Sequence, residues 1–286
     1  MIAIDSPLRS AKKHSQDLRR TGGSWYPPSE LRVASLARTD FTSPRLFLDA
    51  PLSPGQRVSL EPAQQHYLID VLRLRAGARV LVFNGRDGEF ATSLDLSSRK
   101  GGLLVLKERL RPQEYGPDLD YLFAPLKHAR LDYMAQKAVE MGVRRLRPVM
   151  TRRTQASRVN LERLRANAIE AAEQCGVIWL PEILGEVSLP EALADWPADR
   201  LLVFCDEEAE IADPLEALNR VGDGSDLLAL LIGPEGGFED GEREAILRLP
   251  NVVRLSLGPR ILRADTAAVA ALALIQAKLG DWRRSA

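Results

Sequence analysis

Between Arg45 and Pro112 the hydrophobic residues come in short runs separated by polar and turn residues. Four runs have the length and the β-branched or aromatic content of strands: residues 45–48, 78–83, 89–94 and 103–106. Asn84-Gly85 and Asp87-Gly88 supply the positive φ angles that a hairpin needs between the second and third runs. One helix is expected near residues 64–72. The pattern predicts a small β-barrel over residues 44–112.

After Pro112 the pattern changes to alternating strands and helices. Strands are expected at residues 119–124, 146–150, 201–204, 227–232 and 252–257, with a short extended run near Pro181. Helices are expected at residues 130–141, 161–174, 242–249 and 266–279. The runs 201–204 and 227–232 are apolar at nearly every position, as in strands buried on both faces of a parallel sheet. The fold class is therefore α/β, and residues 113–286 are expected to form a second domain.

Residues 1–43 form a polar extension without the hydrophobic periodicity that would let them bury themselves. We expect this segment to be poorly ordered. Its basic character raises the possibility of a transit peptide. Its four acids and its lack of a clean amphipathic pattern count against one.

The composition, 45% hydrophobic and 27% charged, is that of an ordinary globular protein. No run of 18 apolar residues is present, so no membrane span is expected. Cys175 and Cys205 stand in apolar settings and are interpreted as small buried residues in a reducing cytosol. His14, His66 and His128 are scattered, with no cysteine or acid pair at ligand spacing, so no metal site is expected. These features predict a cytoplasmic protein.

The net charge of zero hides an uneven distribution along the chain. Residues 101–170 hold 14 Lys and Arg against 8 Asp and Glu, a net charge of +6. Residues 182–250 hold 4 Arg against 18 Asp and Glu, a net charge of −14. The basic stretch indicates a surface that faces a polyanion, and the alternative is a set of solvated helix faces.

Two glycine-containing loops each follow a predicted strand: residues 233–238, Gly-Pro-Glu-Gly-Gly-Phe, and residues 258–266, Gly-Pro-Arg-Ile-Leu-Arg-Ala-Asp-Thr. Ligands of open α/β sheets bind outside the carboxyl ends of the strands, where both loops would lie. Glycines allow main-chain groups to approach a ligand, and nearby Leu and Ile side chains could form a slot for adenine. The spacing matches neither dinucleotide nor phosphate-loop motifs. Taken alone, the loops could also be plain turns.

The amino-acid sequences of these loops, and their order along the chain, resemble those of the RsmE family. Members of this family are methyltransferases that modify N3 of a uridine in small-subunit (16S) ribosomal RNA. The resemblance is carried by residues 231–238 and 255–267, and also by residues 137–143, 170–175, 45–48 and 84–85. It runs from about Arg45 to Leu279. It implies a PUA-like RNA-binding barrel followed by a SPOUT domain that contains a trefoil knot, an exception to the general absence of knots.

The same resemblance implies that the knotted loops hold S-adenosylmethionine and that the SPOUT domain forms a homodimer. Carried over by position, the cofactor-binding residues are Gly233, Pro234, Glu235, Gly236, Leu257, Gly258, Ile261, Leu262 and Thr266. Arg263 would stabilise negative charge on the uracil as its N3 proton leaves, since a guanidinium stays charged. The alternative for Arg263 is an ion pair with C-terminal acids. The general base is not identified, and Glu235 or water could take the proton.

The partner implied is ribosomal RNA in the small subunit, and basic side chains are candidates for phosphate contacts. They are Arg45, Arg73, Arg75, Lys127, Arg152, Arg153 and Arg158. Each could instead be an ordinary surface charge.

The sequence departs from the family pattern at three places. Val177 stands where the family often has Arg, and Asp265 where it often has Glu. The segment Thr151-Arg152-Arg153-Thr154 replaces a usual Thr-Glu-Arg-Ser. These changes leave the two loops complete and put only the details of RNA contact in doubt.

Two other functions remain open. One is ribose 2′-O-methylation of RNA, which related knotted enzymes perform. The other is a non-catalytic RNA-binding factor for ribosome assembly, although such a factor would have no need of two complete cofactor loops.

Overall fold

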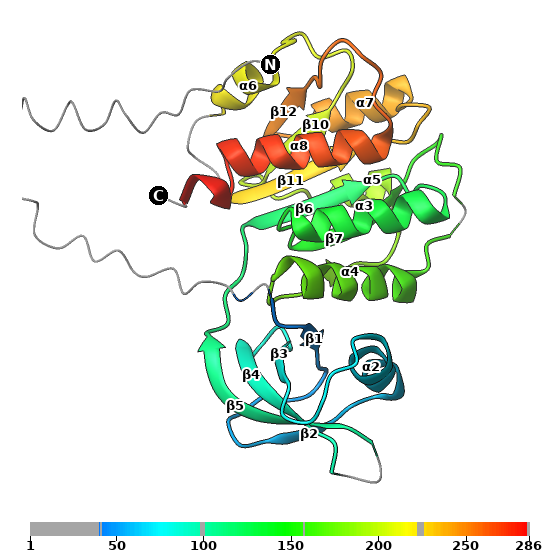
Figure 1. Ribbon diagram of the computed structural model, residues 1–286. Helices are drawn as coiled ribbons and strands as arrows, with labels where there is room; N and C mark the ends of the chain where they lie inside the picture. Colours follow the sequence, from blue (N-terminus) through cyan, green and yellow to red (C-terminus); the bar gives the residue numbers. More distant parts are fainter. Residues whose placement is uncertain (1–39, 41, 98–100, 157, 222–225, 285–286) are drawn as a thin grey trace, which may run out of the picture. The chain divides into compact units, whose positions relative to one another are not determined.

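The computed structural model describes residues 40, 42–97, 101–156, 158–221 and 226–284. The predicted poorly ordered extension, residues 1–43, lies outside the described residues except at positions 40, 42 and 43. Figure 1 shows the two sheets that dominate the described chain.

The first sheet has five strands in the order β1-β3-β4-β5-β2 and is curled into a half-barrel (Figure 1). Its strands are β1 (Arg45–Phe47), β2 (Arg57–Ser59), β3 (Arg79–Phe83), β4 (Glu89–Asp95) and β5 (Leu103–Arg111). Strand β1 pairs with β3 in parallel, and the other pairs are antiparallel. The predicted helix is present as a short α2 (Pro62–Gln65) that continues into a π-helix, η2 (His66–Val71). Leu68 of η2 is fully buried against the inner face of the sheet.

The sequence pattern missed β2 and the second half of β5. Strand β2 has three residues, of which only Val58 is hydrophobic, so it carries no periodic signal. Strand β5 continues past Leu106 through Lys107, Glu108 and Arg109, whose side chains are exposed. Pairing with β4, and not hydrophobicity, holds this part of the strand.

The second sheet is parallel, with the strand order β12-β10-β11-β6-β7-β8. Its strands are β6 (Asp118–Phe123), β7 (Arg145–Met150), β8 (Glu182–Ile183), β10 (Leu201–Cys205), β11 (Leu227–Ile232) and β12 (Val252–Leu255), and β9 (Val187–Ser188) pairs with β7. The central strands β10 and β11 are buried on both faces, as their continuous apolar runs predict. The chain crosses β10 when it passes from β11 to β12.

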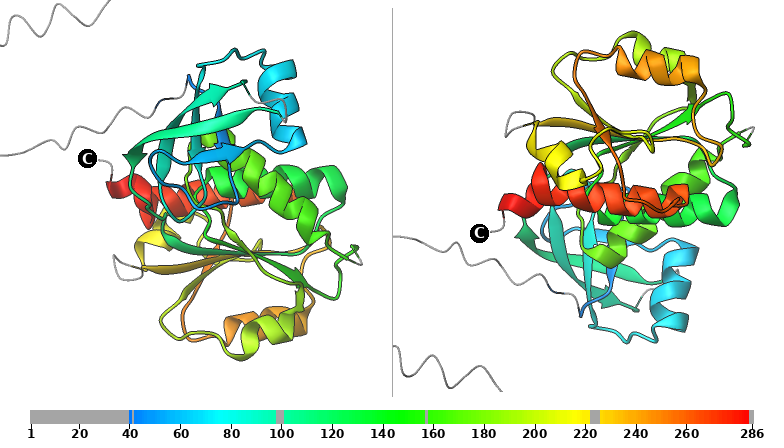
Figure 2. Two further views of the ribbon diagram at one scale, coloured as in Figure 1. Left: turned by 90° about the horizontal axis from the view of Figure 1, so that it is seen from below. Right: turned by 90° about the horizontal axis from the view of Figure 1, so that it is seen from above.

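Helices cover both faces of this sheet (Figure 2). The buried side chains of the strands alternate between two core clusters, one on each face. One face is packed by α3 (His128–Glu140), α4 (Leu161–Cys175), α6 (Pro214–Asn219) and α8 (Ala264–Lys278). The other is packed by α5 (Leu189–Ala194) and α7 (Asp240–Leu247). A short 3-10 helix, η3 (Asp281–Arg284), follows α8. Within the described residues no helix is both long enough and apolar enough to cross a membrane.

Side chains of β1 and β3 pack against α4. Phe47 and Phe83 meet the alanines of α4 in a buried cluster, with their rings 5.7 Å apart. The Phe47 backbone N–H donates to the Glu173 carboxylate of α4 over 2.9 Å. Arg111 of β5 donates to the Gly176 carbonyl at the end of α4 over 2.9 Å. The half-barrel is therefore attached to α4 by apolar contacts and by hydrogen bonds.

Glu173 makes the stability of this attachment depend on pH. Burial raises the pKa of Glu173 to about 7, although the Phe47 N–H works against the rise. A carboxyl whose pKa is raised in the folded state contributes less stability as pH rises, here between its ordinary value of 4.5 and about 7. A Glu173→Gln variant keeps an oxygen for the Phe47 N–H and has no charge to desolvate. Urea unfolding at pH 8 should show it to be about 3 kcal/mol more stable than the wild type.

The same comparison at pH 4.5 is the control for Glu173→Gln. There the wild-type carboxyl is mostly protonated when folded, so the difference in unfolding free energy should nearly vanish. A difference that is the same at both pH values would show that ionisation of Glu173 does not limit the stability.

Candidate functional site

The strand order brings several loops together at the carboxyl edge of the parallel sheet. Strand β10 lies between β11 and β12, so the loop that follows it lies between the two glycine loops. Strand β6 is the other neighbour of β11, and the segment after β6 leads into α3. The loop after β7 comes next along the edge. Five connections from distant parts of the sequence therefore meet here, as expected for a ligand site of an α/β sheet.

The loop of residues 233–238 is held in a fixed shape. A Cβ on Gly233 would lie 2.4 Å from the Phe238 ring, so only glycine fits there. Phe238 packs edge-on against Phe204 of β10, with their centroids 5.3 Å apart. Gly237 has a φ of +69°, and its N–H donates to the Pro234 carbonyl over 2.9 Å in a tight turn. The Gly236 carbonyl accepts a hydrogen bond from Arg153 over 2.8 Å.

The loop between β12 and α8 is open on one side. Gly258 has a φ of +92°, and no atom would lie within 4 Å of a Cβ there. Ile261 is 97% exposed, which is unusual for a large aliphatic side chain. Leu257 packs partly against the main core of the domain, and Leu262 is half-buried. Apolar side chains therefore stand beside open space, an arrangement that fits an adenine ring.

Arg130 of α3 links the two glycine loops. Its Nε and Nη2 donate to the two carboxylate oxygens of Asp265, each over 3.0 Å. Its Nη1 forms an ion pair with Glu235. The hydrogen bonds from Arg130 hold the pKa of Asp265 below its ordinary value. A bidentate arginine of this kind fixes the orientation of both partners.

Sequence reasoning did not select Arg130, and it predicted Glu235 as a cofactor-binding residue that could also take the N3 proton. The ion pair with Arg130 occupies the Glu235 carboxylate. Thr266 lies in the first turn of α8, and its N–H donates to Asp265 over 3.0 Å. Arg263 directly precedes α8 as its N-cap residue and is exposed. The expected alternative for Arg263, an ion pair with C-terminal acids, is not found among the described residues.

The loop after β10 was also missed, although its place follows from the topology. Asp206 is buried there and accepts hydrogen bonds from Arg243 of α7 and Arg254 of β12, the latter over 2.7 Å. Burial tends to raise the pKa of Asp206, but the two arginines outweigh it and the pKa is lowered. Ligands of open α/β sheets bind outside the carboxyl ends of the strands, and this criterion, which selected the glycine loops, applies to the loop after β10 as well.

Four of the predicted RNA-contact residues lie at or beside this edge: Lys127, Arg152, Arg153 and Arg158. Lys127 precedes α3 and is exposed. The Arg153 side chain is bound to the Gly236 carbonyl, so it supports the glycine loop. The Arg152 side chain is exposed, and only its backbone N–H is bound, to Glu242 over 2.8 Å.

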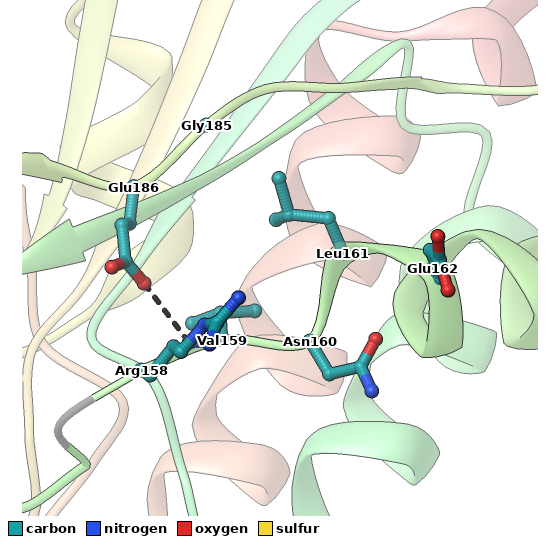
Figure 3. A pocket seen from close by; sticks show the side chains of 7 residues that line it. All are labelled: Arg158, Val159, Asn160, Leu161, Glu162, Gly185 and Glu186. Atoms are coloured by element: carbon teal, nitrogen blue, oxygen red, sulfur yellow. Dashed lines mark hydrogen bonds between the residues drawn. The ribbon is translucent and has the colours of Figure 1, made fainter.

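Arg158 borders two hollows next to this edge. One has a volume of about 780 Å³ and is bounded by residues 158–162 and by Gly185 and Glu186. Figure 3 shows the Leu161 side chain directed into it, and Glu186 accepting a hydrogen bond from the Val159 N–H over 2.9 Å. The second has a volume of about 310 Å³ and extends from Arg158 and Asn160 to Lys127. The two form a hollowed surface from the loop after β7 to the start of α3.

The prediction that Arg45 contacts RNA phosphate is wrong. Its side chain is 3% exposed and donates to Glu89 over 2.7 Å. Glu89 is equally buried and also pairs with Arg111. Moving the Arg45 side chain into solvent to meet a phosphate would leave the buried Glu89 carboxylate with one partner fewer, which is strongly unfavourable. Arg73 and Arg75, by contrast, are exposed near the end of η2.

Comparison with known protein families matches both parts of the chain. Residues 114–276 match the RNA methyltransferase domain, and residues 60–101 match the RNA methyltransferase PUA domain. The chain is 29% identical over 233 residues to ribosomal RNA small subunit methyltransferase E of Rickettsia conorii, covering 81% of this chain and 94% of that protein. It is 31% identical over 226 residues to the protein of the same name from Synechocystis, covering 78% and 73%.

Two solved structures share the fold. The chain superposes on ribosomal RNA small subunit methyltransferase E of Neisseria gonorrhoeae bound to S-adenosyl methionine with a TM-score of 0.75 and 26% identity, covering 84% of this chain and 99% of that one. A putative methyltransferase of Legionella pneumophila in complex with the same cofactor gives a TM-score of 0.71 and 28% identity, with the same coverage.

Proposed function

The chain belongs to the RsmE family of RNA methyltransferases, and on that premise we propose that it methylates N3 of a uridine in 16S ribosomal RNA with S-adenosylmethionine. One observation carries the proposal. The loops of residues 233–238 and 258–266 are joined by Arg130, which lies more than 100 residues before both of its partners, and they leave open space beside Gly258 and Ile261. The similar structures from Neisseria gonorrhoeae and Legionella pneumophila hold this cofactor.

The residues present fit the cofactor. Leu257, Ile261 and Leu262 offer an apolar slot to adenine, and the backbone at Gly233, Pro234 and Gly236 offers polar groups to the rest. Asp265 and Glu235 do not bind the cofactor directly in this proposal. Their shared ion pairs with Arg130 fix the distance between the two loops.

When bound, S-adenosylmethionine supplies a methyl group that a nucleophile can attack in line. Uridine N3 carries a proton and is paired in a duplex, so the base must be unpaired or extruded first. The exposed Arg263 then stabilises the negative charge that develops on the uracil as this proton leaves. Glu235 could accept the proton only by giving up its ion pair with Arg130. We therefore assign proton removal to water.

The RNA-facing surface in this proposal is the carboxyl edge together with the half-barrel. Lys127 and Arg158 are exposed cations that line the hollows of that edge, where phosphates could lie, and Arg152 is an exposed cation of the loop after β7. We assign residues 44–112 to RNA binding and residues 113–286 to catalysis. The acidic stretch of residues 182–250 would face away from the RNA except at the loop 233–238.

We further propose that the protein acts in the cytoplasm as a homodimer formed through the second domain. Helix α8 is apolar around most of its circumference, and such a helix is normally buried on all sides. Its inner face packs against α3, α6 and β11. On its other side Val269 and Ala273 are only half-buried and Ala277 is exposed, which a second copy of the chain could cover.

The test is transfer of a labelled methyl group to RNA. Purified protein should label small-subunit RNA and leave large-subunit RNA unlabelled, and naked RNA and assembled subunits are assayed separately to identify the form that reacts. Binding of small-subunit RNA without any transfer to either form would favour the non-catalytic assembly factor. Isothermal titration with S-adenosylmethionine separates that result from failure to bind the cofactor.

A further inference from the structure

Arg73 has a backbone conformation that amino acids other than glycine rarely adopt. Its φ is +56°, and it is the one described residue other than glycine with a positive φ. The left-handed region brings a Cβ close to the backbone, which costs free energy for every residue except glycine. An outlier of this kind is a reason to look for a function at that position.

The local structure explains why the left-handed turn is needed. The π-helix η2 ends at Val71, and two hydrogen bonds close it, Leu72 N–H to the Tyr67 carbonyl over 2.9 Å and Leu74 N–H to the Leu68 carbonyl over 3.0 Å. Closing a helix in this way requires one left-handed residue, for which glycine is preferred. The chain follows that rule after α3 and α4, where Gly142 has a φ of +75° and Gly176 a φ of +81°. Only η2 has an arginine in this role.

The surroundings of Arg73 favour an external partner. Val71 and Leu72, directly before it, are 57% and 38% exposed. Arg73 and Arg75 are exposed and have no ion pair or side-chain hydrogen bond among the described residues. The neighbouring acid, Asp70, is paired with His66 over 2.9 Å. No contact within the described chain therefore accounts for an arginine in place of glycine.

We propose that residues 71–75 form an RNA-docking loop in which Arg73 contacts a phosphate of the substrate. The helix end fixes the backbone at Arg73, so the guanidinium starts from a defined position beside the cation Arg75. The aliphatic side chains of Val71 and Leu72 can pack on a ribose or an unpaired base. Two unpaired cations indicate a polyanion as the partner, and the loop belongs to the half-barrel. This inference rests on the proposed function, which supplies the RNA.

Two variants of the same residue test the proposal, Arg73→Gly and Arg73→Ala. Both remove the guanidinium, but only glycine relieves the backbone. Arg73→Gly should raise the Tm by about 2 °C, and Arg73→Ala should leave it nearly unchanged. Both should weaken binding of small-subunit RNA by about 10-fold, and the slope of log affinity against log salt should flatten by about 0.7 to 0.9. Affinity for S-adenosylmethionine should stay at the wild-type value.

Arg248→Ala is the matched control, because Arg248 is an exposed arginine directly after α7, in the acidic stretch of residues 182–250 that is proposed to face away from the RNA. The inference is overturned if both Arg73 variants bind RNA as tightly as Arg248→Ala does. A drop in Tm for Arg73→Gly also overturns it, because the arginine would then have a structural role. If the wild-type protein binds no RNA, the proposed function itself is contradicted. This result is distinct from the two outcomes that concern Arg73.

Discussion

An Arg263→Ala variant is expected to transfer methyl groups about 10²-fold more slowly than the wild type, while its affinity for S-adenosylmethionine stays within a few-fold. The guanidinium is exposed at the start of α8, beside the loop proposed to hold the cofactor. The uracil is neutral until its N3 proton leaves, so in the ground state the Arg263 guanidinium has no negative charge to stabilise. Its effect should therefore appear in the rate of transfer measured with bound RNA and saturating cofactor.

Arg260→Ala is the matched control for Arg263, since Arg260 is an exposed arginine of the same loop. Arg260→Ala should lose little methyl-transfer activity if the effect of Arg263 comes from its position beside the substrate base and not from the positive charge of the loop alone. If Arg263→Ala loses cofactor affinity and transfer rate equally, Arg263 acts in cofactor binding and not in stabilising the uracil. Equal rate losses in both variants would remove its special role.

Gly258→Val is expected to abolish binding of S-adenosylmethionine. A Cβ at Gly258 would have no atom within 4 Å, so a valine side chain would extend into the open space proposed for adenine. The loss should be visible in isothermal titration as the absence of a binding signal at cofactor concentrations that saturate the wild type.

The positive φ of Gly258 requires a control, because valine is strained there whatever the ligand does. Gly55 has a φ of +83° and equally open surroundings, and it lies in the half-barrel before β2. Gly55→Val should show a similar loss of stability and retain full cofactor affinity. If Gly258→Val folds and still binds normally, the assigned site is wrong.

Hydrophobic pattern predicted the elements that are buried or amphipathic. The runs at residues 201–204 and 227–232 became β10 and β11, and the helices expected at 130–141 and 161–174 are α3 and α4. Elements with weak periodicity were missed. Helices α5 and α6 have only six residues each, yet Ser188 and Asp213 cap them, and these capping residues were the available signal.

The glycine loops of the proposed site were selected from the sequence, but the contacts that hold them were not. Loops 233–238 and 258–266 carry specific residue patterns in the sequence. Arg130, by contrast, lies more than 100 residues from both Glu235 and Asp265 in the sequence, and no local sequence pattern predicts an ion pair over that separation. Arg45 was misjudged for the same reason, because its partner Glu89 lies 44 residues away and both are buried. Charge in a sequence does not reveal whether a side chain reaches solvent.

In the proposed reaction, the methyl group of S-adenosylmethionine bound at the two glycine loops goes to uridine N3. Small-subunit RNA treated with the protein and S-adenosylmethionine should be digested to nucleosides and analysed by mass spectrometry against synthetic standards. The predicted result is N3-methyluridine, formed about 10²-fold more slowly by Arg263→Ala and at nearly the wild-type rate by Arg260→Ala. A product methylated on the ribose 2′-oxygen, with no N3-methyluridine, would contradict it.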